Sequence, residues 1–271
     1  MKKIAKLLLL VIVLVSLIFV LTGCGQKVET KYTSKPKTEN TSKTNTTKTN
    51  ETAEETTKGS IDEVDFVAAA EKQMAMPEEG EEIAIIHVKE YGDITVKFFP
   101  EVAPKAVENF VTHAKNGYYD NGSFHRVIED FMIQGGDPLG TGYGGESIWG
   151  EGFGTELDYS LFPYKGALCM AMSSLPNSIG SQFFIEQQNS SELMISQLKT
   201  TVYPEELVNA YSKYGGSPHI YMNYTVFGQV IEGLDVVDKI AKYTKVEDNN
   251  GTVLKENQPV IESIEITTYK K

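Results

Sequence analysis

Arginine is almost missing from this chain: of its 25 lysine and arginine residues, only Arg126 is an arginine. Arginine differs from lysine in its planar fork of donors, its permanent charge and its weaker hydration. A lone arginine in a lysine-rich chain is either an ordinary surface charge or a residue kept where that fork is needed. The surrounding run, 124–137, combines aromatic, amide and thioether side chains with a Gly-Gly bend, which favours the second interpretation. Strand alternation places Phe124, Arg126 and Ile128 on one face.

Cysteine and histidine are also scarce, which excludes several kinds of site. The cysteines are Cys24, near the N-terminus, and Cys169, in an apolar run, so the main domain cannot form an internal disulfide. The four histidines lack the spacing of zinc ligands, and we expect neither a metal nor a cofactor. The glycine-rich stretch 140–145 is not followed by Gly-Lys-Ser/Thr, so it predicts a turn-rich loop rather than a phosphate-binding loop. The histidines are His87, His113, His125 and His219.

The N-terminal residues predict export and a lipid anchor. Residues 1–23 contain early lysines and then an apolar run from Leu7 to Leu21, shorter than the roughly 20 residues of a membrane span. The end of this signal peptide, Leu-Thr-Gly-Cys, resembles a bacterial lipobox, which implies cleavage before Cys24 and a diacylglycerol on its sulfur. An uncleaved anchor helix is the alternative. In both cases we expect a protein tethered to the cell membrane on its extracytoplasmic face.

Composition divides the rest of the chain into three parts. Residues 24–60 are mostly Thr, Lys, Asn, Glu and Ser, and they predict a disordered stalk that spans about 30–36 Å. Residues 61–81 form an N-terminal extension, in which 64–70 would make a helical turn or two. Residues 82–271 form the main domain. Residues 61–271 hold 32 of the 37 acidic and 15 of the 25 basic side chains, a net charge of −17, which argues against nucleic acid as a partner.

The main domain is expected to be mainly β. Alternating apolar residues over 83–88 and 94–99, separated by a turn at Gly92, predict a β-hairpin. Short strands follow, separated by glycine-rich loops. The further expected strands are 124–128, 131–135, 166–172, 182–186, 224–230 and 261–268. This order indicates an antiparallel barrel or sandwich rather than a parallel, doubly wound sheet.

Two helices and one insertion complete the expected domain. Pro104 in a first turn, regularly spaced apolar residues and Gly117 as terminator predict a helix between them. A second helix is expected over 234–241. Between 188 and 218 the composition changes, and Pro204 begins an amphipathic helix. We expect this helical insertion either to pack onto the body of the domain or to bind a partner.

Seven motifs stand out in the main domain. They are Phe124–Asp137, Gly140-Thr141-Gly142, Ser147–Gly150, Leu168–Ala171, Pro176-Asn177, Gly180–Ile185 and Val226–Val230. Together, from about residue 82 to residue 268, they resemble the cyclophilin family of peptidyl-prolyl cis-trans isomerases. No single motif is decisive, but seven in register are specific. The resemblance implies the family's fold, a closed eight-stranded antiparallel barrel capped by two helices.

The resemblance also implies the site. Arg126, Phe131 and Gln134 would be catalytic, with Arg126 donating to the prolyl nitrogen and Gln134 holding a peptide carbonyl. Phe131, Met132 and Phe184 would form the slot for the proline ring. The backbone of 171–173 would pair with the substrate. The implied substrate-binding residues are Met132, Ala171, Met172, Ser173, Gln182, Phe184, His219, Ile220 and Tyr224.

The chain departs from the family pattern at several of these positions. Met172 stands where many cyclophilins have asparagine. His219 is the counterpart of the tryptophan of members that bind cyclosporin strongly, Ile220 replaces the leucine after it, and Tyr224 replaces a downstream histidine. We therefore predict retained isomerase activity with weak cyclosporin binding.

We expect an enzyme that isomerises X-Pro bonds of exported proteins and so assists their folding at the outer face of the membrane. Its partners would be proline-containing polypeptides. Two other functions stay open: a non-catalytic module that docks proline-containing segments, and a surface adhesin whose insertion at 188–218 makes the important contact. The intact set of Arg126, Phe131, Gln134 and Phe184 favours the enzyme.

Overall fold

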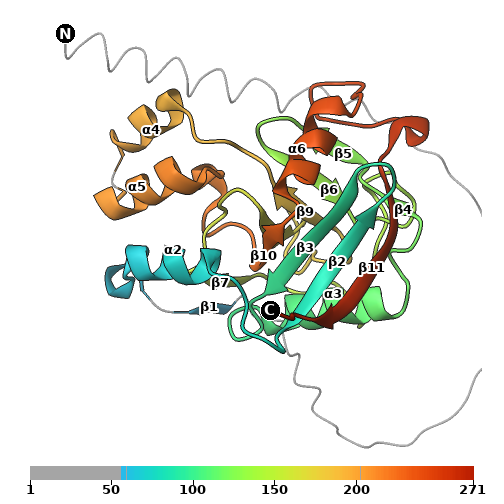
Figure 1. Ribbon diagram of the computed structural model, residues 1–271, viewed down its shortest axis with the longest axis horizontal. Helices are drawn as coiled ribbons and strands as arrows, with labels where there is room; N and C mark the ends of the chain where they lie inside the picture. Colours follow the sequence, from blue (N-terminus) through green and yellow to red (C-terminus); the bar gives the residue numbers. More distant parts are fainter. Residues whose placement is uncertain (1–55, 59, 202) are drawn as a thin grey trace, which may run out of the picture. The chain divides into compact units, whose positions relative to one another are not determined.

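A curled antiparallel sheet of nine strands dominates the computed structural model, which describes residues 56–58, 60–201 and 203–271 (Figure 1). The strand order is β4-β11-β2-β3-β10-β8-β9-β6-β5. A separate pair, β1 and β7, is parallel. The strands are β1 (Thr56–Lys58), β2 (Glu82–Val88), β3 (Gly92–Phe98), β4 (Gly122–Ser123), β5 (Arg126–Ile128), β6 (Met132–Gly135), β7 (Glu156–Asp158), β8 (Ala167–Met170), β9 (Phe183–Glu186), β10 (Val226–Glu232) and β11 (Val260–Thr268).

Helices form the remaining regular structure of the described residues. The helices that the sequence predicts at Pro104 and at 234–241 are α3 and α6. The insertion contains α4 and α5, and the extension contains α2. The α-helices are α2 (Phe66–Met74), α3 (Pro104–Lys115), α4 (Glu192–Leu198), α5 (Glu205–Tyr214) and α6 (Leu234–Tyr243), and the 3-10 helices are η2 (Ile61–Glu63), η3 (Pro218–Ile220) and η4 (Lys255–Asn257).

Strand pairing does not close the sheet into a barrel. The edge strands β4 and β5 have two and three residues, and the strands that they pair with are β11 and β6. Arg126 of β5 also forms an isolated bridge with Thr252, which lies outside the named strands. Only residues 124 and 125 lie between β4 and β5, so the sheet must curl until its two edges are within reach of two residues. The expectation of a closed eight-stranded barrel is therefore wrong. The sheet has nine strands, and the chain itself, rather than a hydrogen-bonded ladder, joins its edges.

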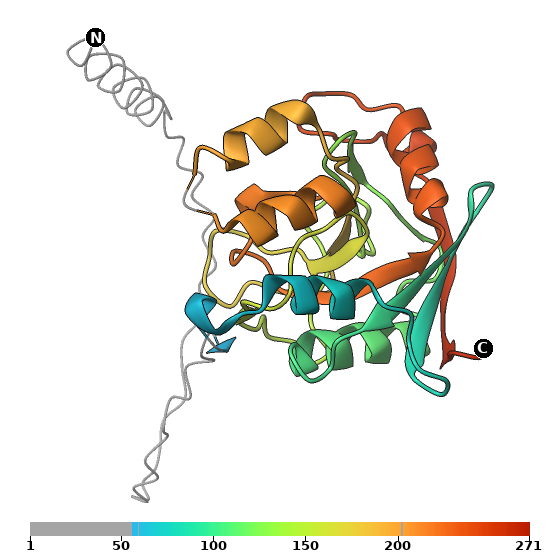
Figure 2. The ribbon, with the colours of Figure 1, turned by 60° about the vertical axis from the view of Figure 1, so that its left-hand side comes forward.

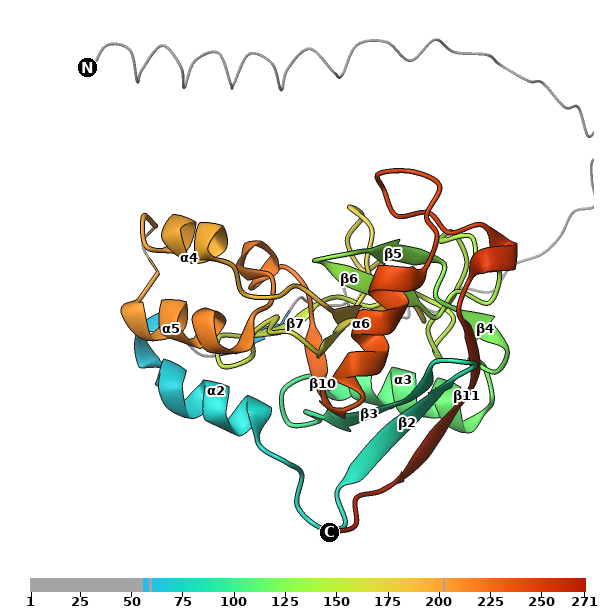
Figure 3. The same cartoon turned by 45° about the horizontal axis from the view of Figure 1, so that its top comes forward.

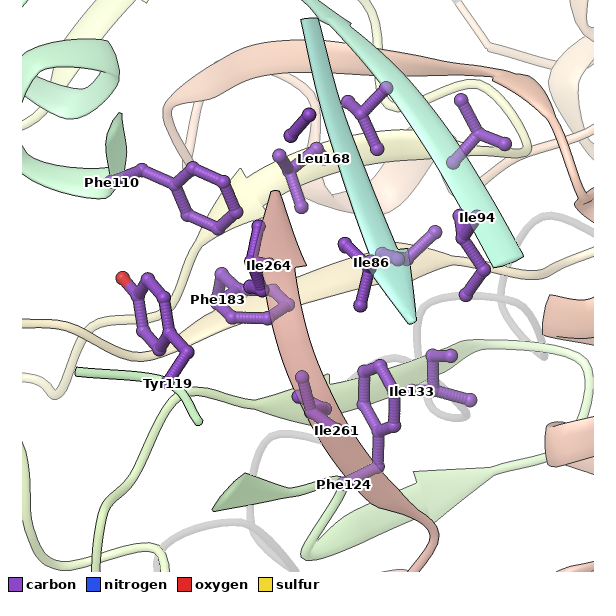
Figure 4. Packing of buried hydrophobic residues seen from close by; sticks show 14 of the residues in the cluster. Ile86, Ile94, Phe110, Tyr119, Phe124, Ile133, Leu168, Phe183, Ile261 and Ile264 are labelled. Carbon is purple, nitrogen blue, oxygen red and sulfur yellow. The ribbon is translucent and has the colours of Figure 1, made fainter. Parts of the chain in front are cut away.

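The inner face of the sheet encloses the main core together with α3 and α6 (Figure 4). Pro104 at the first turn of α3 has the φ that a helix needs, and Gly117, with φ of +69°, follows the helix end. Phe110 of α3 is fully buried, with its ring centroid 5.2 Å from the rings of Tyr119 and Phe183. Residues of both helices thus contribute to this core.

A second, smaller core lies among α2, α4 and α5, which Figures 1 and 2 show one above the other. Phe66 comes from the extension, Leu207 and Tyr211 come from α5, and Tyr164 comes from the body of the domain. The insertion therefore packs onto the body, as one of the two expectations states. The helical turn or two expected in the extension is the nine-residue α2, and Asp65 caps its first turn.

Two polar side chains fasten α2 to the rest of the domain. Gln73 Nε2 donates to the carbonyl oxygen of Phe162 (2.7 Å), and the N–H of Phe162 donates to Gln73 Oε1 (2.9 Å). Lys97 Nζ, from β3, donates to the carbonyl oxygens of Lys72 (3.0 Å) and Ala75 (2.6 Å). The last carbonyls of a helix have no partner within it, so Lys97 satisfies the C-terminal end of α2. Burial lowers the pKa of this lysine.

Several predictions concern residues that the structure does not describe. The signal peptide 1–23, the lipidated Cys24 and the stalk as far as residue 55 lie outside the described residues. β1, at Thr56–Lys58, falls within the range assigned to the stalk. Within the described part of the chain, every helix is too short or too polar to cross a membrane.

Candidate active site

Strand register places three of the expected site residues in one row. In the β5–β6 hairpin Arg126 lies opposite Gln134, and in the β6–β9 pair Gln134 lies opposite Phe184. Directly opposed residues point to the same face of a sheet, so these side chains are neighbours. Met132, two residues from Gln134, shares that outer face, whereas Ile133 between them packs in the main core.

The Arg126 side chain is half-buried and held at two points. Its Nε donates to the carbonyl oxygen of Asn250 (2.8 Å), and its Nη1 donates to Gln134 Oε1 (3.1 Å). Nη1 also lies 4.0 Å from the sulfur of Met132. Burial lowers the pKa of the guanidinium, but an arginine keeps its charge at any pH a protein meets. Nη2 donates to no atom of the described residues, so it is available to a ligand.

An apolar slot adjoins this guanidinium. Met132 and Phe184 are buried, and Phe131 is partly exposed. The ring of Phe131 lies 5.4 Å from that of His219, and Phe184 meets Tyr224 edge to face at the same centroid distance. One hydrophobic cluster contains Phe131 and five of the nine implied substrate-binding residues. These five are Met132, Ala171, Phe184, Ile220 and Tyr224.

A chain of amides links Arg126 to the glycine-rich loop. Gln134 Oε1 accepts from Arg126 Nη1, and Gln134 Nε2 donates to Gln182 Oε1 (2.9 Å). Gln182 Nε2 in turn donates to the carbonyl oxygen of Gly144 (2.8 Å). Both glutamines line a pocket of about 310 Å³ between this loop and residues 171–173. The hydrogen bonds to Arg126 and to Gln182 therefore both fix the orientation of the Gln134 side chain.

The Gly-Gly bend after Gln134 has a steric cause. Gly136 has φ of +83°, which side chains rarely adopt, and a Cβ atom there would lie 2.5 Å from the carbonyl oxygen of Ser181. Only glycine lets β6 turn so close to the start of β9.

The stretch 171–173 presents one residue with free backbone groups. The N–H of Ala171 donates to the carbonyl oxygen of Gln182 (2.9 Å), and the N–H of Ser173 donates to Ser178 Oγ (3.0 Å). The N–H and carbonyl of Met172 have no partner among the described residues. Of the three residues expected to pair with a substrate, Met172 is thus the one whose donor and acceptor are both open.

Phe124 does not share the face of Arg126, so that prediction is wrong. The segment 124–128 is not one continuous strand, because β5 begins only at Arg126. Phe124 and Val127 both pack in the main core, and His125 is buried. The two irregular residues between the edge strands break the side-chain alternation on which the prediction depended.

Asn250 is a site residue that the sequence did not reveal. It lies 124 positions after Arg126, in a loop that Asp248 organises by accepting hydrogen bonds from the N–H groups of Asn250 (2.9 Å) and Thr252 (3.1 Å). The acceptor for Arg126 is a backbone carbonyl, which any residue type supplies. No sequence motif marks such a contact, and it can be recognised only in the folded structure.

The chemistry of the site is that of a polypeptide-binding surface with a fixed cationic donor. No cluster of three or more metal-ligating side chains occurs in 56–58, 60–201 or 203–271. Cys169 lies beneath the slot as a buried thiol, and burial raises its pKa well above its ordinary value. Burial lowers the pKa of His219 at the rim, which favours its neutral form. Fold and site together define a mainly β protein in which a fixed guanidinium donor lies beside an apolar slot.

Comparisons with known proteins identify the family. Residues 83–270 match the family model for cyclophilin type peptidyl-prolyl cis-trans isomerases. A relative from Staphylococcus saprophyticus, named "Putative peptidyl-prolyl cis-trans isomerase", is 52% identical over 188 residues, which cover 69% of this chain and 93% of the relative. One of the same name from Staphylococcus aureus (strain USA300) is 50% identical over 190 residues, which cover 70% of this chain and 93% of the relative.

A solved structure agrees with this result. The crystal structure of a Cryptosporidium parvum cyclophilin type peptidyl-prolyl cis-trans isomerase, in the presence of the dipeptide Ala-Pro, matches with a TM-score of 0.54 and 32% identity. The match covers 69% of this chain and 99% of that one. The chain belongs to the cyclophilin-type peptidyl-prolyl cis-trans isomerase family. The family predicted from the sequence motifs is confirmed, and the protein is an isomerase.

Proposed function

We propose that this isomerase acts on X-Pro bonds of exported proteins at the outer face of the membrane, with Arg126 as the donor that stabilises the twisted bond. The proline ring occupies the slot of Phe131, Met132 and Phe184, and Gln134 holds a neighbouring peptide carbonyl. The free backbone groups of Met172 pair with the residue before or after the X-Pro bond.

The physical requirement of the reaction fits these residues. Rotation of an X-Pro bond faces a barrier of about 18–20 kcal/mol because the amide is conjugated. The rotation breaks no covalent bond, so it needs neither a nucleophile nor proton transfer. When the bond twists, the prolyl nitrogen regains its lone pair and becomes a better acceptor. A fixed N–H donor therefore binds the twisted state more strongly than the planar one, which is the condition for catalysis.

The observation that carries the proposal is the position of the only arginine in the chain. Asn250 and Gln134 hold its guanidinium at 2.8 and 3.1 Å beside the apolar slot, while Nη2 is available. A donor that is already oriented loses little entropy when the substrate twists. The relative from Cryptosporidium parvum, studied in the presence of Ala-Pro, supports proline-containing peptides as the substrate class.

A protease-coupled assay on an X-Pro peptide tests this role. We expect Arg126→Ala to lower kcat/KM about 100-fold, the usual effect of losing one oriented transition-state donor, with an unchanged circular dichroism spectrum. Full activity in this variant would remove Arg126 from the mechanism. A wild-type protein that binds the peptide without accelerating isomerisation would instead favour the non-catalytic binding module.

The location at the membrane is proposed from residues 1–24 and from the charge of the domain. A charged start, an apolar run and the sequence Leu-Thr-Gly-Cys support lipidation of Cys24, and the acidic domain suits a position away from anionic lipid headgroups. Metabolic labelling with an alkyne fatty acid checks it. We expect label and membrane association in the wild type and neither in Cys24→Ala, and an unlabelled wild-type protein would contradict the anchor.

Weak cyclosporin binding remains a prediction. It follows from His219, Ile220 and Tyr224 at the slot, where strongly binding family members carry other residues. Isothermal titration with cyclosporin checks it, and His219→Trp is expected to tighten binding. Strong binding by the wild type would contradict the prediction.

A further inference from the structure

The insertion carries a pocket of its own, with a volume of about 380 Å³, between α4 and η3. Its apolar walls come from Leu193, Met194 and Leu198 of α4, with Tyr203 and Pro218. Met194 and Leu198 are anchored in the second core, whereas Leu193 is 68% exposed. Figure 3 shows α4 on the side of α5 away from α2, so this pocket belongs to the helical layer rather than to the sheet.

The pocket shares a wall with the slot. Three consecutive residues of η3 connect them: Pro218 lines the pocket, Ile220 is buried in the slot cluster, and His219 faces both. The His219 ring lines the pocket and lies 5.4 Å from the ring of Phe131. Because an extended chain advances about 3.3 Å per residue, a polypeptide that leaves the slot past His219 reaches the pocket after about two to four residues.

The chemistry of the pocket selects an uncharged side chain. Among the residues that the structure describes, no Asp, Glu, Lys or Arg lines the pocket, although residues 61–271 carry a net charge of −17. Its rim is formed by amide and hydroxyl side chains, including Gln188, whose Oε1 accepts from Ser217 Oγ (2.8 Å). Ser191 caps α4 by accepting from the N–H of Met194 (3.2 Å). These contacts hold the walls in place, so the cavity is already formed before an apolar side chain binds.

We propose that this pocket binds a Leu-, Met- or Phe-sized side chain of the same polypeptide whose proline occupies the slot, about two to four residues away from that proline. The inference rests on the proposed function of the slot and names its substrate class: unfolded segments in which a proline lies close to an apolar residue. The pocket meets the slot at His219, which is why the occupant is the substrate itself rather than a separate partner.

Peptide binding tests this subsite without relying on turnover. Fluorescence anisotropy with the full-length protein in detergent would compare an Ala-Pro peptide flanked by alanines with peptides in which one leucine or phenylalanine stands one to four residues from the proline, on either side. We expect one offset on one side to bind about tenfold more tightly than the alanine peptide, equivalent to about 1.4 kcal/mol. Equal affinity at every offset would overturn the subsite.

Matched variants assign the effect to the pocket. Leu193→Glu places a carboxylate in the pocket from an exposed position, and we expect it to remove the tenfold preference. Val67→Glu makes the same change at a 50% exposed residue of α2 outside the pocket, and we expect it to keep the preference. Gln197→Glu is a second pocket variant in case Leu193→Glu unfolds, which a thermal melt would reveal. A preference that survives in both folded pocket variants would contradict the proposal.

The two proposals fail in different ways. Arg126→Ala with full isomerase activity would overturn the role of Arg126, while a tenfold preference lost in Leu193→Glu would still support the pocket. Conversely, an isomerase that loses activity in Arg126→Ala but binds all peptides equally would keep the proposed function and lose the subsite.

Discussion

The main core and the second core are built in different ways. In the main core, Phe110 contacts four aromatic rings from neighbouring elements, and paired strands surround it. The second core joins α2 to α5, segments more than 100 residues apart, and within the described residues the hydroxyls of Tyr164 and Tyr211 are buried without a partner. A buried unpaired hydroxyl costs about 1–3 kcal/mol, so the second core is the weaker one. The strong core supports the slot, and the weak one supports the insertion pocket.

The largest expected effect is on the free energy of unfolding, and one phenylalanine substitution in each core tests the difference between the two cores. Phe110→Ala is expected to lower the free energy of unfolding by about 3–5 kcal/mol, because the residue is fully buried and surrounded by rings. Phe66→Ala in the second core should cost about half as much, since Phe66 is 8% exposed and contacts one ring, that of Phe162 at 6.0 Å. Urea denaturation of both variants checks this. Equal losses would contradict the difference between the cores.

A smaller effect is expected at the polar contact that fastens α2. Gln73→Ala removes both hydrogen bonds to the backbone of Phe162 and leaves buried groups unpaired, so we expect a loss of about 2–3 kcal/mol in unfolding free energy. Glu71→Ala, on the exposed side of the same helix, is the control and should change stability by less than about 0.5 kcal/mol. If Gln73→Ala left the unfolding free energy unchanged, the hydrogen bonds of Gln73 would not be what fastens α2.

A buried carboxyl group connects the sheet to both ends of the insertion. Glu186 Oε2 lies 2.6 Å from Ser217 Oγ, which lies 2.8 Å from Gln188 Oε1. A serine hydroxyl has one proton and cannot donate to both oxygens, so a proton on Glu186 lets both contacts be hydrogen bonds. Burial raises the pKa of Glu186 from an ordinary 4.5 to about 8, which keeps this proton in place at neutral pH.

The carboxyl group of Glu186 also makes the unfolding free energy depend on pH. Between about pH 4.5 and 8 the folded protein retains a proton that the unfolded chain has lost, so the contribution of Glu186 to stability falls as pH rises through this window. Glu186→Gln cannot titrate. We expect the unfolding free energy of the wild type to fall between pH 5 and pH 8, and that of this variant to fall less. If the unfolding free energies of the wild type and Glu186→Gln changed with pH in the same way, Glu186 would be ionised in the folded state.

The same comparison shows what a sequence can predict. The strands of the main core alternate in hydrophobicity, and their motifs identified the family. The second core gave weaker signals: the extension suggested a turn or two where α2 has nine residues, because neither α2 nor α5 buries its apolar face without the other. The failure at Phe124 and the missed Asn250 have a related cause. Both depend on how the chain joins the sheet edges, which no local pattern records.

The central claim is that the fork of Arg126, rather than its charge alone, stabilises the twisted X-Pro bond. Arg126→Lys keeps the charge but loses the planar fork that Asn250 and Gln134 hold. In the protease-coupled assay we predict that kcat/KM of this variant falls to within about threefold of Arg126→Ala, with the fold intact. A lysine variant with wild-type kcat/KM would contradict the account.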